Sequence, residues 1–267
     1  MIVVTGATGT IGRALVGQLP PDEVIAVVRA PAGFACREEL GDFDRPETIG
    51  DLLSPGDRLF LNSSIWPGFV AAHQAVIDLA GKAGVAQVVT VSVRGARPGG
   101  LLGIGAHGEI DRHLRASGIP HAILQPTGYL QNLPAEVRDG RFHGSYGPAR
   151  VNYLDARDIA DVAAVLLTGE PVPGADYALT GSESLTHEEI AAVLSEVTGR
   201  DIRYVDLPEA ELRARLESEG VPESVARDLP RLMASLNWSQ TTSVIRDTTG
   251  RDPRTLAEFA AEFHDRF

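Results

Sequence analysis

The first residues of the chain run from an apolar segment through three evenly spaced glycines into a second apolar segment. Ile2, Val3 and Val4 are typical of a buried strand, and Gly6, Gly9 and Gly12 follow directly. Glycines allow a tight turn and let the backbone approach a pyrophosphate, and the free N–H groups that begin the next helix attract the anion. Because the pattern lies between a predicted strand and a predicted helix at 14–19, it predicts a dinucleotide phosphate site. The alternative is a glycine-rich turn without a ligand.

The end of the second predicted strand bears on the type of dinucleotide. Val24 to Val28 are apolar, Arg29 follows, and no acidic residue occurs from Val24 to Ala35. An acid here would bind the ribose 2′-hydroxyl of NAD, whereas a guanidinium matches a 2′-phosphate through charge-assisted hydrogen bonds. The sequence therefore favours NADP(H), with a solvated surface arginine as the alternative.

Composition limits the classes of protein and of partner. A chain of 267 residues with 43% hydrophobic and 22% charged residues can bury a large core in one large or two modest domains. The net charge of −12 argues against nucleic acid. Cys36 is the only cysteine and we expect no signal peptide, transit peptide or membrane span, which favours the cytoplasm. The seven histidines lack ligand spacing, so no metal is expected.

Apolar strands alternate with helical stretches, which predicts a Rossmann-type α/β fold with a doubly wound parallel sheet. Further strands are expected to close at 41–44 and to cover 59–64, 87–92 and 121–125, with helices at 71–83 and from about 108 to 116. Ligands bind outside the carboxyl ends of such strands. Ser63, Ser64, Ser92 and the turn 126–129 should therefore meet at one edge.

Shorter elements follow, with strands expected at 151–154 and 177–180 around a helix at 158–167. Thr186 with Glu189, and Thr255 with Glu258, are spaced as capping boxes at helix starts. We expect a dinucleotide-binding domain over 1–132, completed by 151–181. Residues 133–150 and 182–267 should form a smaller, mainly helical substrate-binding lobe, with a homodimer as one possible assembly.

Several motifs together carry a family resemblance. They are the glycine turn, Val28-Arg29, Gly41-Asp42, His107-Gly108-Glu109-Ile110, 114–118, 125–132, 155–160 and 177–181. The chain resembles the NmrA-like branch of the atypical short-chain dehydrogenases, which includes NADPH:quinone oxidoreductases. The resemblance implies that Gly6, Thr8, Gly9, Thr10, Ile11 and Gly12 hold the pyrophosphate and that Arg29 holds the 2′-phosphate. It also implies that Asp42 and Phe43 flank the adenine and that Asn62, Ser63 and Ser64 line the nicotinamide-ribose side.

Ordinary short-chain dehydrogenases exchange a proton through a Tyr-x-x-x-Lys pair. Lys82 is the only lysine, and the residue four positions before it is Asp78, so that pair is impossible here. By the resemblance, His107 stands where the missing lysine would be, ahead of the helix expected from 108, and an imidazole can donate a proton or polarise a carbonyl. Tyr129 can present its hydroxyl to a substrate. For both residues a structural role is the alternative.

Three functions remain open. The first is an NADPH-dependent reductase of a quinone or related aromatic or conjugated carbonyl compound, because the product anion of such acceptors is easily protonated. Trp66 and Phe69 could then wall a flat substrate, or simply pack their loop. The second is a non-catalytic NADP(H) sensor, which the resemblance also allows. The third is a sugar-nucleotide epimerase, disfavoured by the missing pair.

Overall fold

The computed structural model describes residues 1–267, which divide into two compact units. The first unit comprises Met1–Pro126, Ala156–Ala178 and Asp247–Gly250, and the second comprises Thr127–Asp155, Leu179–Arg246 and Arg251–Phe267. No helix is both long and apolar enough to span a bilayer.

A seven-stranded sheet in the order β3-β2-β1-β4-β5-β6-β8 forms the first unit's centre. Its strands are β1 (Ile2–Val4), β2 (Val24–Val28), β3 (Arg37–Leu40), β4 (Arg58–Leu61), β5 (Gln87–Val91), β6 (His121–Pro126) and β8 (Ala175–Leu179). The neighbouring pairs from β3 to β6 are parallel. Every residue of β1, β2 and β5 is buried, and β1 and β2 are accordingly continuous apolar runs, as is typical of parallel sheets covered on both faces. The Rossmann-type fold expected from the sequence is confirmed.

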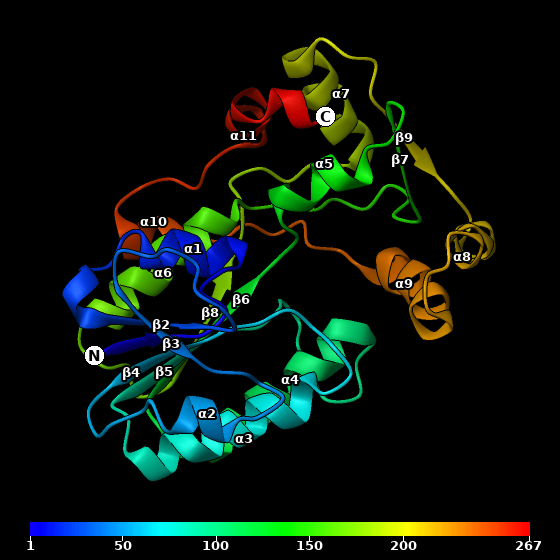
Figure 1. Ribbon diagram of the computed structural model, residues 1–267. Coiled ribbons are helices and arrows are strands. Elements are labelled where there is room, and N and C mark those ends of the chain that lie inside the picture. Colours follow the sequence, from blue (N-terminus) through cyan, green and yellow to red (C-terminus); the bar gives the residue numbers. More distant parts are fainter. The chain divides into compact units, whose positions relative to one another are not determined.

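Helices cover both faces of this sheet (Figure 1). On one face α1 (Thr10–Val16) packs on α6 (Ala156–Thr168), while α2 (Glu47–Gly50), α3 (Phe69–Ala83) and α4 (Leu102–Ala116) lie on the other. A short 3₁₀ turn, η1 (Pro21–Glu23), precedes β2. Val76, Ile77, Ile110 and Leu114 are fully or almost fully buried between α3, α4 and the sheet.

The second unit is mainly helical. It contains η2 (Leu130–Asn132), α5 (Leu133–Glu136), β7 (Arg141–Gly144), α7 (His187–Thr198), β9 (Arg203–Asp206), α8 (Glu209–Ser218), α9 (Glu223–Ser235), α11 (Leu256–Glu262) and η3 (His264–Arg266), and α10 (Val244–Thr249) crosses the boundary. Strands β7 and β9 pair in parallel. Leu133, Phe142, Leu194 and Phe259 belong to this unit's own apolar core. Both expected capping boxes are present, at the starts of α7 and α11.

Two sequence expectations were wrong in detail. Residues 151–154 form isolated bridges to Leu185 and Tyr129 instead of a strand. Helix α4 begins at Leu102, six residues before the expected start, so His107 lies inside it rather than ahead of it. Gly103, Gly105 and Gly108 weaken the helical pattern there, because glycine disfavours helices in isolation. Two of them are nevertheless needed for close packing, since a Cβ on Gly105 would lie 2.2 Å from the carbonyl oxygen of Gly100 and one on Gly108 would lie 2.1 Å from the carbonyl carbon of Arg97.

Candidate cofactor and active site

The glycine turn is shaped by close backbone contacts. Gly6 has a φ of +62°, and a Cβ there would lie 2.5 Å from the Asn62 carbonyl oxygen. A Cβ on Gly12 would lie 2.2 Å from the carbonyl oxygen of Gly6. Gly9 is the N-cap residue of α1, and the start of this helix has neither a side-chain cap nor an acidic residue in its first turn. The N–H groups at the start of a helix have no partner within the helix, and glycines leave room for a ligand beside them. Such a site suits a pyrophosphate.

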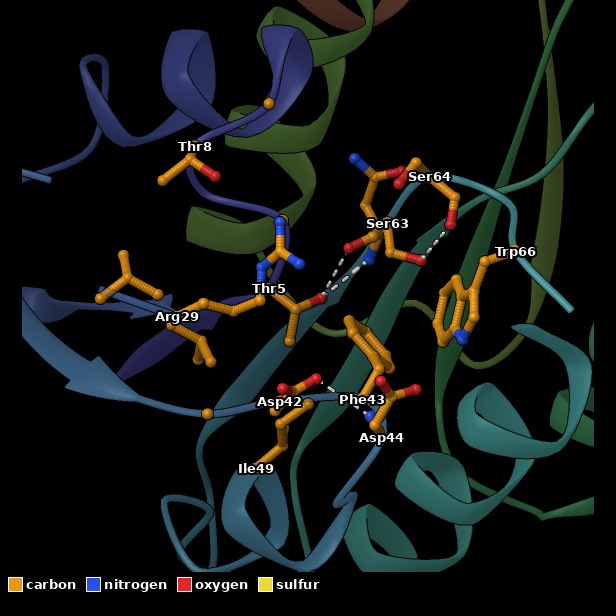
Figure 2. Close-up of a pocket in the computed structure, with 16 residues that line it drawn as sticks. Thr5, Thr8, Arg29, Asp42, Phe43, Asp44, Ile49, Ser63, Ser64 and Trp66 are labelled. Atoms are coloured by element: carbon orange, nitrogen blue, oxygen red, sulfur yellow. Dashed lines mark hydrogen bonds between the residues drawn. The ribbon is translucent and has the colours of Figure 1, made fainter. Parts of the chain in front are cut away.

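A cleft of about 440 Å³ opens beside this turn, at the carboxyl ends of β1, β2 and β4 (Figure 2). It is lined by Thr5, Gly6, Thr8, Gly9, Val27, Val28, Arg29, Gly41, Asp42, Phe43, Asp44, Ile49, Asn62, Ser63, Ser64 and Trp66. Of the expected cofactor residues, Thr10, Ile11 and Gly12 lie on α1 and do not line the cleft. Sequence reasoning missed Ile49, which comes from a four-residue helix with no motif.

Arg29 is exposed at the end of β2 and has no hydrogen-bond or ion-pair partner within the chain. Figure 2 shows its side chain entering the cleft from one side and Trp66 from the other. An unpaired guanidinium at this strand end is available to a ligand anion. The residues present therefore fit a dinucleotide with a phosphate on its adenosine ribose.

Thr5 ties together the two strand ends below the cleft. Its backbone N–H donates to the Phe60 carbonyl oxygen at 3.0 Å, and its hydroxyl accepts from the Asn62 N–H at 2.9 Å. The same hydroxyl has two carbonyl oxygens, those of Phe60 and Asn62, within 3.1 Å as acceptors. This buried network places Asn62 and Ser63 at a defined distance from the glycine turn.

A buried imidazole, that of His73, packs against residues that line the cleft. His73 is 2% exposed, stacks on Phe43 with ring centroids 4.6 Å apart, and lies with Nδ1 2.9 Å from the Phe69 carbonyl oxygen. That oxygen only accepts, so Nδ1 carries the proton and Nε2 is an acceptor, 3.4 Å from the Ser63 hydroxyl. Burial lowers the pKa of His73 to about 4, and the imidazole is neutral near pH 7.

His107 is half-buried on α4, with its ring edge-on to Phe69 at 5.1 Å. Burial lowers its pKa to about 4, so at neutral pH it carries no proton to transfer as an imidazolium. The neutral ring of His107 can still donate one N–H hydrogen bond to a carbonyl oxygen. Exposed Ile65 lies close to Gly103, one turn earlier on the same helix.

Tyr129 belongs to the second unit, where it forms a bridge with Leu154. It is half-buried, and burial raises the pKa of its phenol. It is not among the residues that line the cleft. Its catalytic role stays a prediction.

Ser92, the first residue beyond β5, donates a hydrogen bond of 2.7 Å from its hydroxyl to the Asp111 carboxylate on α4. The sequence placed Ser92 at this edge but offered no signal for Asp111, which reads as an ordinary polar helix residue. No group of three or more His, Cys, Asp or Glu side chains lies close enough to hold a metal ion.

Comparisons with known proteins agree with this geometry. Residues 6–170 match the model of an NAD(P)H-binding family. The chain is 33% identical to an NAD(P)H azoreductase of Xenophilus azovorans over 97% of this chain and 96% of that protein. It is 31% identical to quinone oxidoreductase 2 of Escherichia coli K12, over 85% and 84% of the two chains. The crystal structure of an Escherichia coli NADPH-dependent quinone oxidoreductase complexed with NADPH superposes with a TM-score of 0.85 at 26% identity, covering 98% of this chain and 99% of that one.

Proposed function

This chain belongs to the NAD(P)H-binding family and is an NAD(P)H-dependent oxidoreductase, and from that premise we propose that it uses NADPH to reduce a quinone or a related aromatic or conjugated carbonyl compound. The carrying observation is the unpaired Arg29 at the end of β2, which lines the same cleft as Gly6 and Gly9 of the glycine turn. Two relatives above 30% identity are named for azo and quinone reduction, which supports flat conjugated acceptors.

Each part of the cleft has a task in this proposal. The glycine turn and the start of α1 bind the pyrophosphate, Arg29 binds the 2′-phosphate, and Asp42 with Phe43 flanks the adenine. Asn62, Ser63 and Ser64 hold the nicotinamide ribose. The bound nicotinamide supplies hydride. Since hydride transfer between held partners needs mainly orientation, positioning by the protein accounts for much of the rate.

Around the nicotinamide end, the side chains suit an aromatic acceptor. Trp66 lines the cleft and contacts Phe43 edge-on, with ring centroids 5.6 Å apart. Exposed Ile65 precedes it, and His107 offers an N–H group. An apolar wall with few polar groups is typical of sites for flat organic molecules. A small-molecule substrate follows from the enzyme class, while its aromatic character is part of the proposal.

The test is NADPH consumption, followed by nicotinamide absorbance, against a panel of quinones, conjugated enones and azo compounds, with NADH as the matched control. The proposal predicts turnover of at least one conjugated acceptor and a preference for NADPH. Tight NADPH binding without any turnover would favour the sensor function instead. We propose that the protein is located in the cytoplasm, where a single cysteine stays reduced. Light scattering of the same preparation tests whether the protein forms the proposed homodimer.

A further inference from the structure

A buried histidine contacts two residues that line the cofactor cleft. His73, on α3, is almost fully buried, and its ring stacks on Phe43 with centroids 4.6 Å apart and planes 12° apart. Its Nε2 atom lies 3.4 Å from the Ser63 hydroxyl oxygen. Phe43 and Ser63 both line the cleft, whereas His73 does not. His73 can therefore act on a cofactor only through these neighbours.

The two ring nitrogens of His73 have different partners. Nδ1 lies 2.9 Å from the Phe69 carbonyl oxygen, one turn earlier on the same helix. A carbonyl oxygen only accepts, so Nδ1 carries the single proton of the neutral ring. Burial lowers the pKa of His73 to about 4, against the opposing effect of the Phe69 carbonyl, and the ring stays neutral near pH 7. Nε2 is left as an acceptor, and the Ser63 hydroxyl is the donor that reaches it.

The single proton of the Ser63 hydroxyl has two acceptors inside the chain. One is Nε2 of His73, and the other is the Ser64 carbonyl oxygen, at 3.1 Å. Ser64 is exposed, so water can bond its carbonyl when the serine proton is elsewhere. Nε2 belongs to a buried ring between Phe43 and Phe69, and a buried polar atom left without a donor is strongly unfavourable. The proton is therefore more stable on the imidazole side, although that distance is longer.

We propose that His73 is a positioning residue for the nicotinamide ribose, because its Nε2 atom holds the Ser63 proton away from the cleft. This inference rests on the proposed function. The Ser63 oxygen then presents lone pairs and no proton to the cofactor. It can accept a hydrogen bond but cannot donate one.

An acceptor oxygen matches the part of the cofactor assigned to Ser63. The nicotinamide ribose carries hydroxyl groups and the nicotinamide carries an amide NH₂ group, all of which donate hydrogen bonds. Phosphate oxygens of the same cofactor only accept, so a serine oxygen without a free proton offers them no bond. The neighbouring backbone is held in a similar way, because the Asn62 N–H donates to the buried Thr5 hydroxyl at 2.9 Å. Buried side chains thus fix both the backbone and the hydroxyl direction of the 62–63 segment.

The test removes Nε2 and keeps an aromatic ring. His73→Phe retains a flat ring against Phe43, while the Ser63 hydroxyl becomes free to turn its proton toward the cleft. NADPH affinity, measured by fluorescence titration, should fall about two- to tenfold, the range expected for one neutral hydrogen bond. The fragment 2′,5′-ADP contains the adenine and the 2′-phosphate but no nicotinamide ribose, so its affinity should stay within about twofold. His121→Phe, which alters a buried imidazole on β6, is the matched control and should change neither affinity.

A double-mutant cycle with Ser63→Ala separates an effect through Ser63 from a general effect on packing. Ser63→Ala alone should lower NADPH affinity by a similar factor, because the same bond to the cofactor is lost. Adding His73→Phe to Ser63→Ala should lower the affinity by less than about twofold more, since His73 then has no hydroxyl to orient. A structural role of His73 would instead give the full loss in both backgrounds.

The positioning role would be overturned by equal losses of NADPH and 2′,5′-ADP affinity in His73→Phe, or by the same loss with and without Ser63→Ala. If His73→Phe does not fold, His73→Leu, which is apolar and favours a helix, decides by the same measurements. A wild type that does not bind NADPH would refute the proposed cofactor itself. A wild type that binds NADPH, with no change in His73→Phe, would overturn only the role of His73.

Discussion

At the scale of single residues, the proposed preference for NADPH over NADH depends on Arg29. Its guanidinium is exposed, unpaired and at the cleft, and NADH offers it no phosphate. Because a charge-assisted hydrogen bond is worth about 1.5–3 kcal/mol, Arg29→Ala should weaken NADPH binding roughly 10- to 100-fold and leave NADH binding nearly unchanged. Fluorescence titration with both cofactors measures this. Arg37→Ala, on the exposed edge strand, is the control. Equal losses for NADPH and NADH would contradict the role of Arg29.

Residue types with a known chemical preference could be placed from the sequence, whereas residues whose role depends on burial could not. The place of Arg29 at the end of a strand was predictable because the apolar run of Val24–Val28 is visible in the sequence, while its role with the cofactor stays a prediction. The protonation states of His107 and Asp111 were not, because burial and neighbouring charges set them. Near pH 7, His107 is therefore expected to donate a hydrogen bond from its neutral ring and not to transfer a proton as an imidazolium.

At the scale of elements, the packing of α1 against the glycine turn depends on Gly12. A Cβ there would meet the backbone of Gly6 and Ala7 within 2.8 Å, and backbone atoms cannot turn aside as a flexible side chain can. Gly12→Ala should therefore lower the free energy of unfolding by about 1–3 kcal/mol and reduce NADPH affinity, measured by urea titration and fluorescence. In Gly17→Ala, at the other end of the helix, the new Cβ lies 3.5 Å from its nearest neighbour and φ is −67°. If Gly12→Ala and Gly17→Ala had the same free energy of unfolding and the same NADPH affinity, the close contact of Gly12 with Gly6 would not control the position of α1.

The central strands β1, β2 and β4 were predictable as elements because each is a mainly apolar run, whereas β3 (Arg37–Leu40) is charged and partly exposed and carries no such pattern. Helix α4 shows where the pattern fails, since Gly105 and Gly108 pack closely against Gly100 and Arg97 and, as glycines, weaken the helical signal in the sequence. The pairing of β7 with β9 was also missed. Arg203–Asp206 is half-exposed and carries charges at both ends, so neither alternation nor an apolar run marks it.

At the scale of the whole molecule, three histidines far apart in the chain stay neutral inside it. Burial lowers the pKa of His73, His107 and His187 to about 4 each, against an ordinary value of 6.5. The unfolded chain therefore binds more protons than the folded one between about pH 4 and 6.5. The stability that these groups contribute is fully present above pH 6.5 and is lost as the pH falls toward 4. Asp111 opposes this trend below pH 6, because its pKa is raised.

Three histidines outweigh one aspartate, so the free energy of unfolding should fall as the pH is lowered from 7 to 5. Each histidine contributes at most about 1.4 kcal/mol per pH unit. Urea unfolding at constant ionic strength measures the slope, and His107→Phe, which keeps an aromatic ring against Phe69, should make it shallower. His264→Ala, at an exposed position, should leave it unchanged. A stability that rose on acidification would mean that the buried imidazoles acquire protons without unfolding, and the neutral state assigned to His107 near the cleft would then be wrong as well.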